Sequence, residues 1–272
     1  MCERGSAEPS LLRHNLERIL KVLITFALEA EFAPWRRARH FAPIANAGFP
    51  LFESIHSQLQ IRAIITGVGP ARAQLAAREA LHWQPDVCIA AGFAGGLKPS
   101  YRTGEVLVAA TVRDAESQRS ISANPEIIAE AIAAGARGIN ALCTSDRPLA
   151  SVDDKRRMGR IADAVDMESF FVLFEAQEQG IQGVAIRAVS DAADENVPMD
   201  FSEVLDNRGR VRIWRLVAKI VRAPQHIPAL IRLGFASRRG AQGLAQVLDK
   251  TTAALQAAPG SVSHVSAEAV TA

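Results

Sequence analysis

Continuous apolar runs, separated by helical sequence, constrain the fold of this chain more than any other feature. Most of them stop at a glycine or an acidic residue, and the clearest span residues 22–27, 61–66, 87–91, 106–112 and 184–189. An unbroken apolar run of this length predicts a strand buried on both faces. Helical sequence between the runs, as at residues 71–83 and 125–134, predicts an α/β fold. We therefore expect a single-domain three-layer α/β/α architecture around a mixed central sheet, with a helical appendage at the C-terminus.

Changes in composition divide the chain into four parts. Residues 1–20 predict a loose leader with a short amphipathic helix, and residues 21–205 form the expected α/β domain. Residues 206–257 predict a basic, amphipathic, helical appendage, and residues 258–272 predict a disordered tail.

The overall composition excludes several classes of protein. At 272 residues, with 49% hydrophobic and 22% charged residues, the chain can bury a substantial core. Its formal net charge of +2 implies no general polyanion partner, and no run reaches the roughly 18 apolar residues of a membrane span. A signal peptide is not indicated, and Cys2, Cys88 and Cys143 are too widely spaced for a metal site or a disulfide framework. These features predict a cytoplasmic protein with no metal and no cofactor.

Two glycine clusters follow predicted strands, at residues 67–69 and 92–96. Glycine allows the backbone to approach a ligand closely, although each cluster alone fits a tight turn better than a binding loop. A dinucleotide site is only weakly indicated, because Pro70 and Arg72 follow the first cluster in place of a further glycine. Since ligands of α/β proteins bind outside the carboxyl ends of the strands, two such clusters favour a shared cleft there.

Carboxylates near the ends of predicted elements are the candidates for catalysis. Asp191 follows a largely apolar run, with Ser190 before it, and a charge at this place is costly without a partner. Glu31 follows the first strand, but a carboxylate in the first turn of a helix also fits ordinary helix stabilisation. Asp166 and Glu168 are expected at the opening of a helix, where residues two apart point to different faces. They therefore do not predict a pair acting on one bond, although one of them can reach the cleft.

Five segments together resemble the nucleoside phosphorylase/nucleosidase superfamily. They are residues 27–31 (ALEAE), 67–69 (GVG), 91–97 (AGFAGGL), 165–168 (VDME) and 187–191 (RAVSD), in the order and spacing of that superfamily. The closest general pattern is that of the methylthioadenosine/S-adenosylhomocysteine nucleosidases. The resemblance covers residues 21–200 and implies the fold of the superfamily, a homo-oligomer, and cleavage of a purine N-ribosidic bond.

The resemblance also implies roles for individual residues. Glu31 matches the acid/base that activates the attacking water, and Asp191 matches the general acid that protonates the purine at N7. Such an acid neutralises the departing base, while a carboxylate at the sugar hydroxyls favours the cationic sugar of the transition state. The resemblance further implies that Met167 and Glu168 contact the sugar and that Ser190 supports the acid. The implied base pocket is lined by Pro148 and Leu149. The implied residues around the cleft are Gly69, Phe93, Ala94, Gly95 and Asp166.

The sequence leaves open whether the nucleophile is water or phosphate. Phe93 stands where many members carry a small hydroxyl residue, and Glu31 stands where the phosphorylases tend to have an arginine. Both differences favour water. Phosphorolysis, with phosphate as co-substrate, stays an alternative because of four arginines near the expected cleft edge: Arg36, Arg37, Arg72 and Arg113.

Residues 207–240 are strongly basic, with nine lysines and arginines and no acidic residue. Trp214 lies at the apolar edge of a predicted amphipathic helix, a composition typical of segments at a membrane surface. Packing on the domain or on an oligomer partner fits the pattern equally, and binding to nucleic acid fits it less. The segment resembles the tail of the hopanoid-associated phosphorylases. That resemblance implies removal of adenine from adenosylhopane at the inner face of the cytoplasmic membrane.

The sequence therefore supports three hypotheses. The first is an enzyme that releases adenine from adenosylhopane in hopanoid lipid biosynthesis. The second is a soluble nucleosidase or phosphorylase for a small purine nucleoside such as methylthioadenosine or S-adenosylhomocysteine. The third is a catalytically silent protein that binds nucleosides or associates with membranes. None of the three has a nucleic acid partner.

Overall fold

A computed structural model of the protein describes residues 19–149, 151–195 and 227–257. The strands are β1 (Leu20–Phe26), β2 (Ala42–Ile44), β3 (Leu51–His56), β4 (Leu59–Ile65), β5 (Val87–Gly96), β6 (Val106–Asp114), β7 (Ser120–Ser122), β8 (Arg137–Thr144), β9 (Ala164–Asp166) and β10 (Gln182–Asp191). The helices are α1 (Glu29–Ala38), α2 (Pro70–Leu81), α3 (Pro125–Ala133), α4 (Val152–Met158), α5 (Ser169–Glu178) and α7 (Ile227–Ala257). Each of the five apolar runs forms a strand, as predicted.

The strands form one mixed sheet whose centre is parallel. Strands β4, β1, β5 and β10 run side by side in the same direction. Strand β6 is antiparallel to β10 and parallel to β8, while β9 pairs with both β8 and β5. Five strands, β5, β10, β6, β8 and β9, therefore pair in a closed circuit. The carboxyl ends of the four parallel strands meet at one edge of the sheet.

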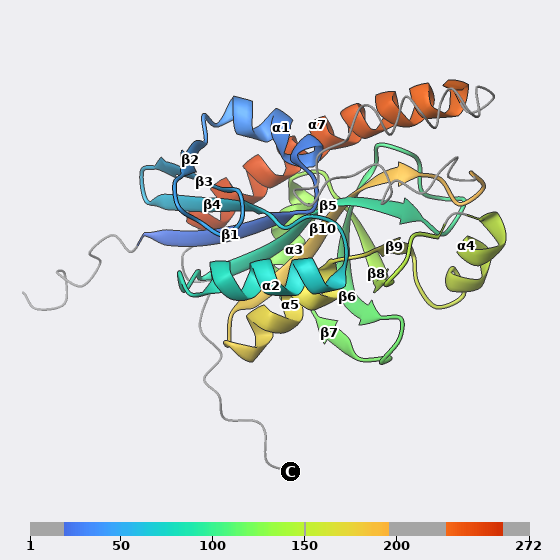
Figure 1. Ribbon diagram of the computed structural model, residues 1–272, viewed down its shortest axis with the longest axis horizontal. Coiled ribbons are helices and arrows are strands. Elements are labelled where there is room, and N and C mark those ends of the chain that lie inside the picture. Colours follow the sequence, from blue (N-terminus) through green and yellow to red (C-terminus); the bar gives the residue numbers. More distant parts are fainter. Residues whose placement is uncertain (1–18, 150, 196–226, 258–272) are drawn as a thin grey trace, which may run out of the picture.

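Helices cover both faces of the sheet, which confirms the predicted three layers. Helices α1 and α7 lie on one face and α2 and α5 on the other (Figure 1). Each face has its own apolar core, and the core beneath α1 and α7 also includes Ile127 and Ala131 of α3. Small side chains of α2, including Ala73, Ala76 and Ala77, recur at helical spacing and allow this helix to pack closely on the sheet.

The predicted C-terminal helix is present, and its second half belongs to the core of the domain. Leu244, Leu248 and Leu255 are fully buried and pack in one cluster with strand residues. Asp249 of α7 accepts a hydrogen bond from the indole nitrogen of Trp35 at 3.1 Å and pairs with Arg39 at 2.5 Å, so the helix is fastened to α1. Most of the basic segment, residues 207–226, lies outside the described residues, as does most of the predicted leader.

One strand extends beyond its prediction. The sequence suggested that the strand of residues 87–91 ends in a glycine turn, but β5 continues through residues 92–96. Hydrogen-bonded neighbours explain the difference, because β10 pairs along this stretch and β9 pairs at Gly95 and Gly96. The glycines therefore lie in extended chain beneath the candidate site. Among the described helices, none is both long and apolar enough to cross a membrane.

Candidate active site

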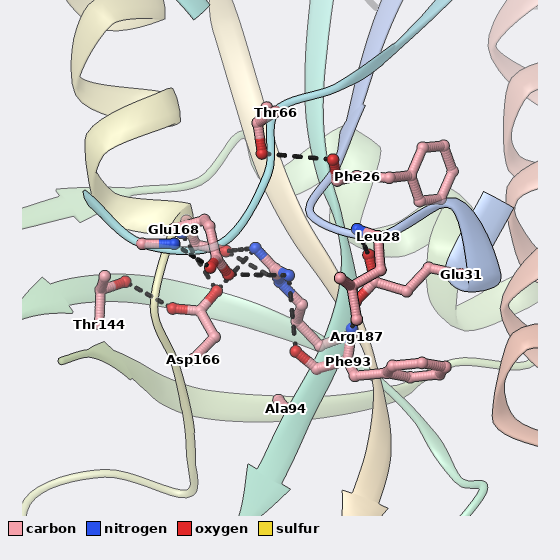
Figure 2. A network of polar contacts seen from close by, with 12 residues as sticks. Phe26, Leu28, Glu31, Thr66, Phe93, Ala94, Thr144, Asp166, Glu168 and Arg187 are labelled. Atoms are coloured by element: carbon pink, nitrogen blue, oxygen red, sulfur yellow. Dashed lines mark hydrogen bonds and ion pairs between the residues drawn. The ribbon is translucent and has the colours of Figure 1, made fainter. Parts of the chain in front are cut away.

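Several of the predicted site residues, among them Glu31, Phe93 and Glu168, come together at the carboxyl ends of the parallel strands (Figure 2). Glu31 lies in the first turn of α1, directly after β1, and Gly69 precedes α2, after β4. Phe93 lies near the end of β5 and Asp191 ends β10. Strand β9 leads into Glu168, the residue directly before α5. Segments up to 160 residues apart in the sequence thus come together at one edge of the sheet.

A buried arginine, Arg187 of β10, organises the centre of the site. Its guanidinium group lies 2.7 Å from the carboxylate of Asp166 and 3.9 Å from that of Glu168. It also donates hydrogen bonds to Oγ of Ser169 at 2.8 and 3.0 Å, and its charge acts on Glu31. Carboxylates are rarely buried unless a cation compensates them. One guanidinium group therefore supports three buried acidic side chains.

Because Gly92 has no side chain, the side chains of Arg187 and Glu31 can both pack against it. A Cβ atom at this position would lie 2.5 Å from Nη1 of Arg187 and 2.8 Å from Oε1 of Glu31. The φ angle of Gly92 is +148°, which side-chain-bearing residues rarely adopt. The first glycine of the 92–96 cluster is thus needed for the packing of charged side chains.

Glu31 is a buried carboxylate held by backbone donors. It is 3% exposed, and its two oxygens accept hydrogen bonds from the amides of Leu28 and Phe93, each at 2.8 Å. Burial raises the pKa of Glu31 above its ordinary value, although Arg187 and the amide donors act in the opposite sense. A carboxylate with a raised pKa takes up a proton more readily, which suits a general base.

Glu168 faces Glu31 across Arg187. Its Oε1 atom accepts a hydrogen bond from the amide of Gly69 at 2.9 Å, and it is 6% exposed. Burial, with Asp166 and Glu31 acting in the same sense, raises the pKa of Glu168 to about 7, while Arg187 and the amide of Gly69 lower it. The position of a Cβ atom on Gly69 has no atom within 4 Å, so the chain beside Glu168 is open.

Glu168→Gln is expected to stabilise the protein more at pH 8 than at pH 5. The pKa of Glu168 is about 7 in the folded protein against an ordinary value of 4.5, so the folded state holds this proton more tightly. Stability is therefore lost as the pH rises from 4.5 to 7, by about 3 kcal/mol at about 1.4 kcal/mol per pKa unit. Glutamine removes that loss and keeps an acceptor for Gly69. Thermal unfolding at both pH values tests this, with Glu178→Gln at an exposed position of α5 as control; equal effects at both pH values contradict it.

Asp166 is committed to protein partners. Its carboxylate accepts hydrogen bonds from Oγ1 of Thr144 at 2.7 Å and from the amide of Ser169 at 3.1 Å, besides pairing with Arg187. The expectation that Asp166 and Glu168 point to different helix faces is wrong, because α5 begins only at Ser169. Both lie before the helix and both approach Arg187. Asp166 therefore orients Arg187 and the start of α5.

Asp191 is held on three sides. Its Oδ1 atom accepts a hydrogen bond from Oγ of Ser190 at 2.6 Å, and Oγ of Ser190 also lies 3.2 Å from the carbonyl of Ala94. Its Oδ2 atom lies 3.2 Å from the Cβ position of Gly95 and pairs with the ammonium group of Lys155, which α4 supplies. The charge at the end of this apolar strand has a partner that the sequence did not identify.

The other predicted residues lie around this network. Met167 is half-buried beside Glu168, and Pro148 is exposed. Leu149 packs against the cluster that includes Val165. The ring of Phe93 is directed away from Glu168 (Figure 2), and its edge lies 3.5 Å from the Cβ position of Gly240 in α7. The roles in binding sugar and base that the resemblance implies for these residues stay predictions.

Sequence reasoning missed two cations of the site, Arg187 and Lys155. Arg187 left a signal, because a charged residue inside the otherwise apolar run 184–189 needs a buried partner. Lys155 left none. It stands in a run of three basic residues after two aspartates, a pattern typical of a solvated helix, and only the fold turns it inward.

Comparisons with known proteins place the chain in a family. The phosphorylase superfamily matches residues 21–222. Futalosine hydrolase of Helicobacter pylori superposes with a TM-score of 0.68 at 17% identity, over 87% of this chain and 99% of that one. A mutant of the methylthioadenosine/S-adenosylhomocysteine nucleosidase of Helicobacter pylori gives 0.68 at 18% identity, over 87% and 99%. The 5′-methylthioadenosine nucleosidase of Arabidopsis thaliana gives 0.66 at 19% identity, over 86% and 95%. These structures share the fold, and because the family match spans most of its length, the chain belongs to the phosphorylase superfamily.

Proposed function

We propose that the protein is an enzyme that cleaves the N-ribosidic bond of an adenine nucleoside. The observation that carries the proposal is the placement of two carboxylates along β5. Glu31 binds the amide of Phe93 at 2.8 Å, and Asp191 lies over Gly95, 3.2 Å from its Cβ position. Residues two apart on a strand are separated by about 6–7 Å. The carboxylates thus approach one strand at two neighbouring positions, which supports a ribosyl group lying between them.

In the proposed reaction these carboxylates act on opposite sides of the bond between C1′ of the sugar and N9 of the base. Asp191 donates a proton to N7 as the electron pair of the C1′–N9 bond moves onto the base. Glu31 accepts a proton from the water whose oxygen bonds to C1′. Glu168 accepts hydrogen bonds from the ribose hydroxyls and stabilises the positive charge of the sugar, against which Met167 packs. The products are adenine and a 5-substituted ribose.

Water is the proposed nucleophile. Of the arginines that left phosphorolysis open, Arg36 pairs with Glu29 at 3.2 Å and lies over the ring of Phe52. Arg72 donates a hydrogen bond to the carbonyl of Thr66 at 3.2 Å. These contacts direct two of the four guanidinium groups to protein partners, which supports hydrolysis over phosphorolysis.

For the substrate we propose an adenosine whose 5′ carbon bears a large apolar group, adenosylhopane. The support is the resemblance of the basic segment 207–240 to the hopanoid-associated phosphorylases, since basic and apolar residues suit a substrate drawn from an anionic membrane. Methylthioadenosine is the second candidate, because a mutant of the Helicobacter pylori nucleosidase was solved with that nucleoside in its active site.

Adenine release by the purified protein tests the activity. Methylthioadenosine, S-adenosylhomocysteine and adenosylhopane in mixed micelles are each supplied, with and without phosphate. The proposal expects adenine from at least one of them, fastest from adenosylhopane, at a rate that complete removal of phosphate leaves unchanged. A rate that depends on phosphate would show that phosphate, not water, is the nucleophile. Failure to release adenine from any of the three nucleosides refutes the proposed activity.

We also propose that residues 207–240 bring the protein to the inner surface of the cytoplasmic membrane. Flotation with anionic vesicles, compared with neutral phosphatidylcholine vesicles at the same salt, tests this. Binding to the anionic vesicles alone is expected. Equal recovery with both kinds of vesicle refutes the electrostatic attraction.

A further inference from the structure

A lysine is completely buried next to the candidate general acid. Lys155 is 0% exposed, although it lies in the short helix α4 between neighbours that face solvent. Arg156 and Arg157 are 74% and 72% exposed and pair with aspartates of their own helix. A buried ammonium group is costly unless every one of its donors is satisfied. Its surroundings must therefore supply three acceptors.

The three acceptors all come from the end of β10 and the turn that follows. The ammonium group contacts Oδ2 of Asp191, the carbonyl of Ala192 at 2.7 Å and the carbonyl of Glu195 at 2.8 Å. Lys155 thus uses its full donor capacity on one segment of five residues. Bonds in which donor and acceptor are both charged are shorter and stronger than neutral ones, so the contact with Asp191 is the strongest of the three.

Helix α4, which carries Lys155, packs closely against a neighbouring segment of the chain. The residue after the helix, Gly159, lies against the chain that follows β5: a Cβ atom there would be 2.6 Å from the carbonyl oxygen of Leu97. On its other side Asp191 accepts from Ser190 and lies over Gly95. The carboxylate of Asp191 therefore lies between α4 and β5 and contacts both.

We propose that Lys155 is a positioning residue that holds Asp191 in the orientation in which it donates its proton to the leaving base. The inference rests on the proposed function. The ammonium group also stabilises the carboxylate that Asp191 becomes once the proton has moved to the base. A purely structural role is the competing explanation, because two of the three bonds of Lys155 go to the backbone.

Two substitutions separate these roles. Lys155→Met removes all three bonds, whereas Lys155→Gln keeps a neutral donor for the backbone carbonyls and removes the charge. For both, we expect kcat of adenine release to fall about 100-fold with KM changed less than about threefold, since an acid that acts only in the transition state contributes to kcat. Arg156→Gln on the exposed face of α4 is the matched control and should leave kcat unchanged.

A double-mutant cycle with Asp191→Asn completes the test. If Lys155 acts through Asp191, then Lys155→Gln in the Asp191→Asn background lowers kcat by less than about threefold. An equal loss in both backgrounds, or an unchanged kcat in Lys155→Gln, overturns the inference while the proposed function stands. If Lys155→Met does not fold, the same criteria apply to Lys155→Gln, whose folding is checked by thermal unfolding. If the wild-type protein releases no adenine, the proposed function falls first and this inference with it.

Discussion

Replacing Arg187 with methionine is expected to lower the free energy of unfolding by about 3–5 kcal/mol at pH 8, the usual loss when one partner of a buried ion pair is removed. Arg187 is 2% exposed, and methionine fills similar apolar volume. The variant leaves Asp166 and Glu168 buried without their cation, and removes the charge that acts on Glu31. Since a domain of this kind has only about 5–15 kcal/mol of stability in total, the loss takes a large part of it.

The loss should be smaller at pH 5 than at pH 8. Arg187 lowers the pKa of Glu31 and of Glu168, so without it both carboxyl groups hold their protons to a higher pH. Near pH 5 they can enter the folded state neutral, whereas at pH 8 folding must bury charges or take up protons. Urea denaturation at both pH values measures this. Arg157→Met, at a 72% exposed position, is the control. A loss below about 1 kcal/mol at pH 8 would show that Arg187 is not the cation supporting the site.

The fold was predictable because the apolar runs are local. A strand buried on both faces needs apolar residues at nearly every position, and residues 22–27, 61–66 and 184–189 show that pattern without reference to any partner. The helix at the C-terminus was predicted, but the burial of its second half in the core of the domain was not, for the opposite reason. Its buried face combines Leu244 and Leu248 with alanines, and alanine also occurs on exposed faces, so the sequence does not show that this face packs against α1 and the sheet.

The carboxylates of the candidate site could be predicted from the sequence, but the cations that pair with them could not. Asp191 and Glu168 stand at the ends of recognisable elements, at the edge of the sheet where the candidate site lies. The side-chain partners of Arg187 in β9 and at the start of α5, and the carboxylate partner of Lys155, lie 18 to 36 residues away along the chain, and the pairing depends on how β9, α4 and β10 meet. No local pattern encodes such a meeting. The glycine cluster was noticed, but its purpose, to leave room for Arg187, Glu31 and Asp191, is visible only in the folded chain.

Asp191→Asn is expected to lower kcat for adenine release by about 10²–10⁴, the range that a positioned general acid contributes. Asparagine has nearly the same shape and keeps an oxygen acceptor for Ser190 or Lys155, but it cannot give a proton to the base. KM should change little, because the proton moves only in the transition state. Steady-state kinetics with the nucleoside that the wild-type protein cleaves fastest gives both constants. Asp194→Asn, at an exposed position of the same turn, is the matched control.

A change of leaving group distinguishes the loss of an acid from general damage to the site. A riboside whose leaving group departs readily as an anion, such as p-nitrophenyl riboside, needs no protonation. If Asp191 is the general acid, Asp191→Asn should cleave it within about tenfold of the wild-type rate. Glu31→Gln should be slow with both substrates, because attack by water is required whichever group leaves. Equal losses of Asp191→Asn with adenine and with p-nitrophenolate would assign Asp191 to the sugar or to the fold, and unimpaired release of adenine would remove it from the mechanism.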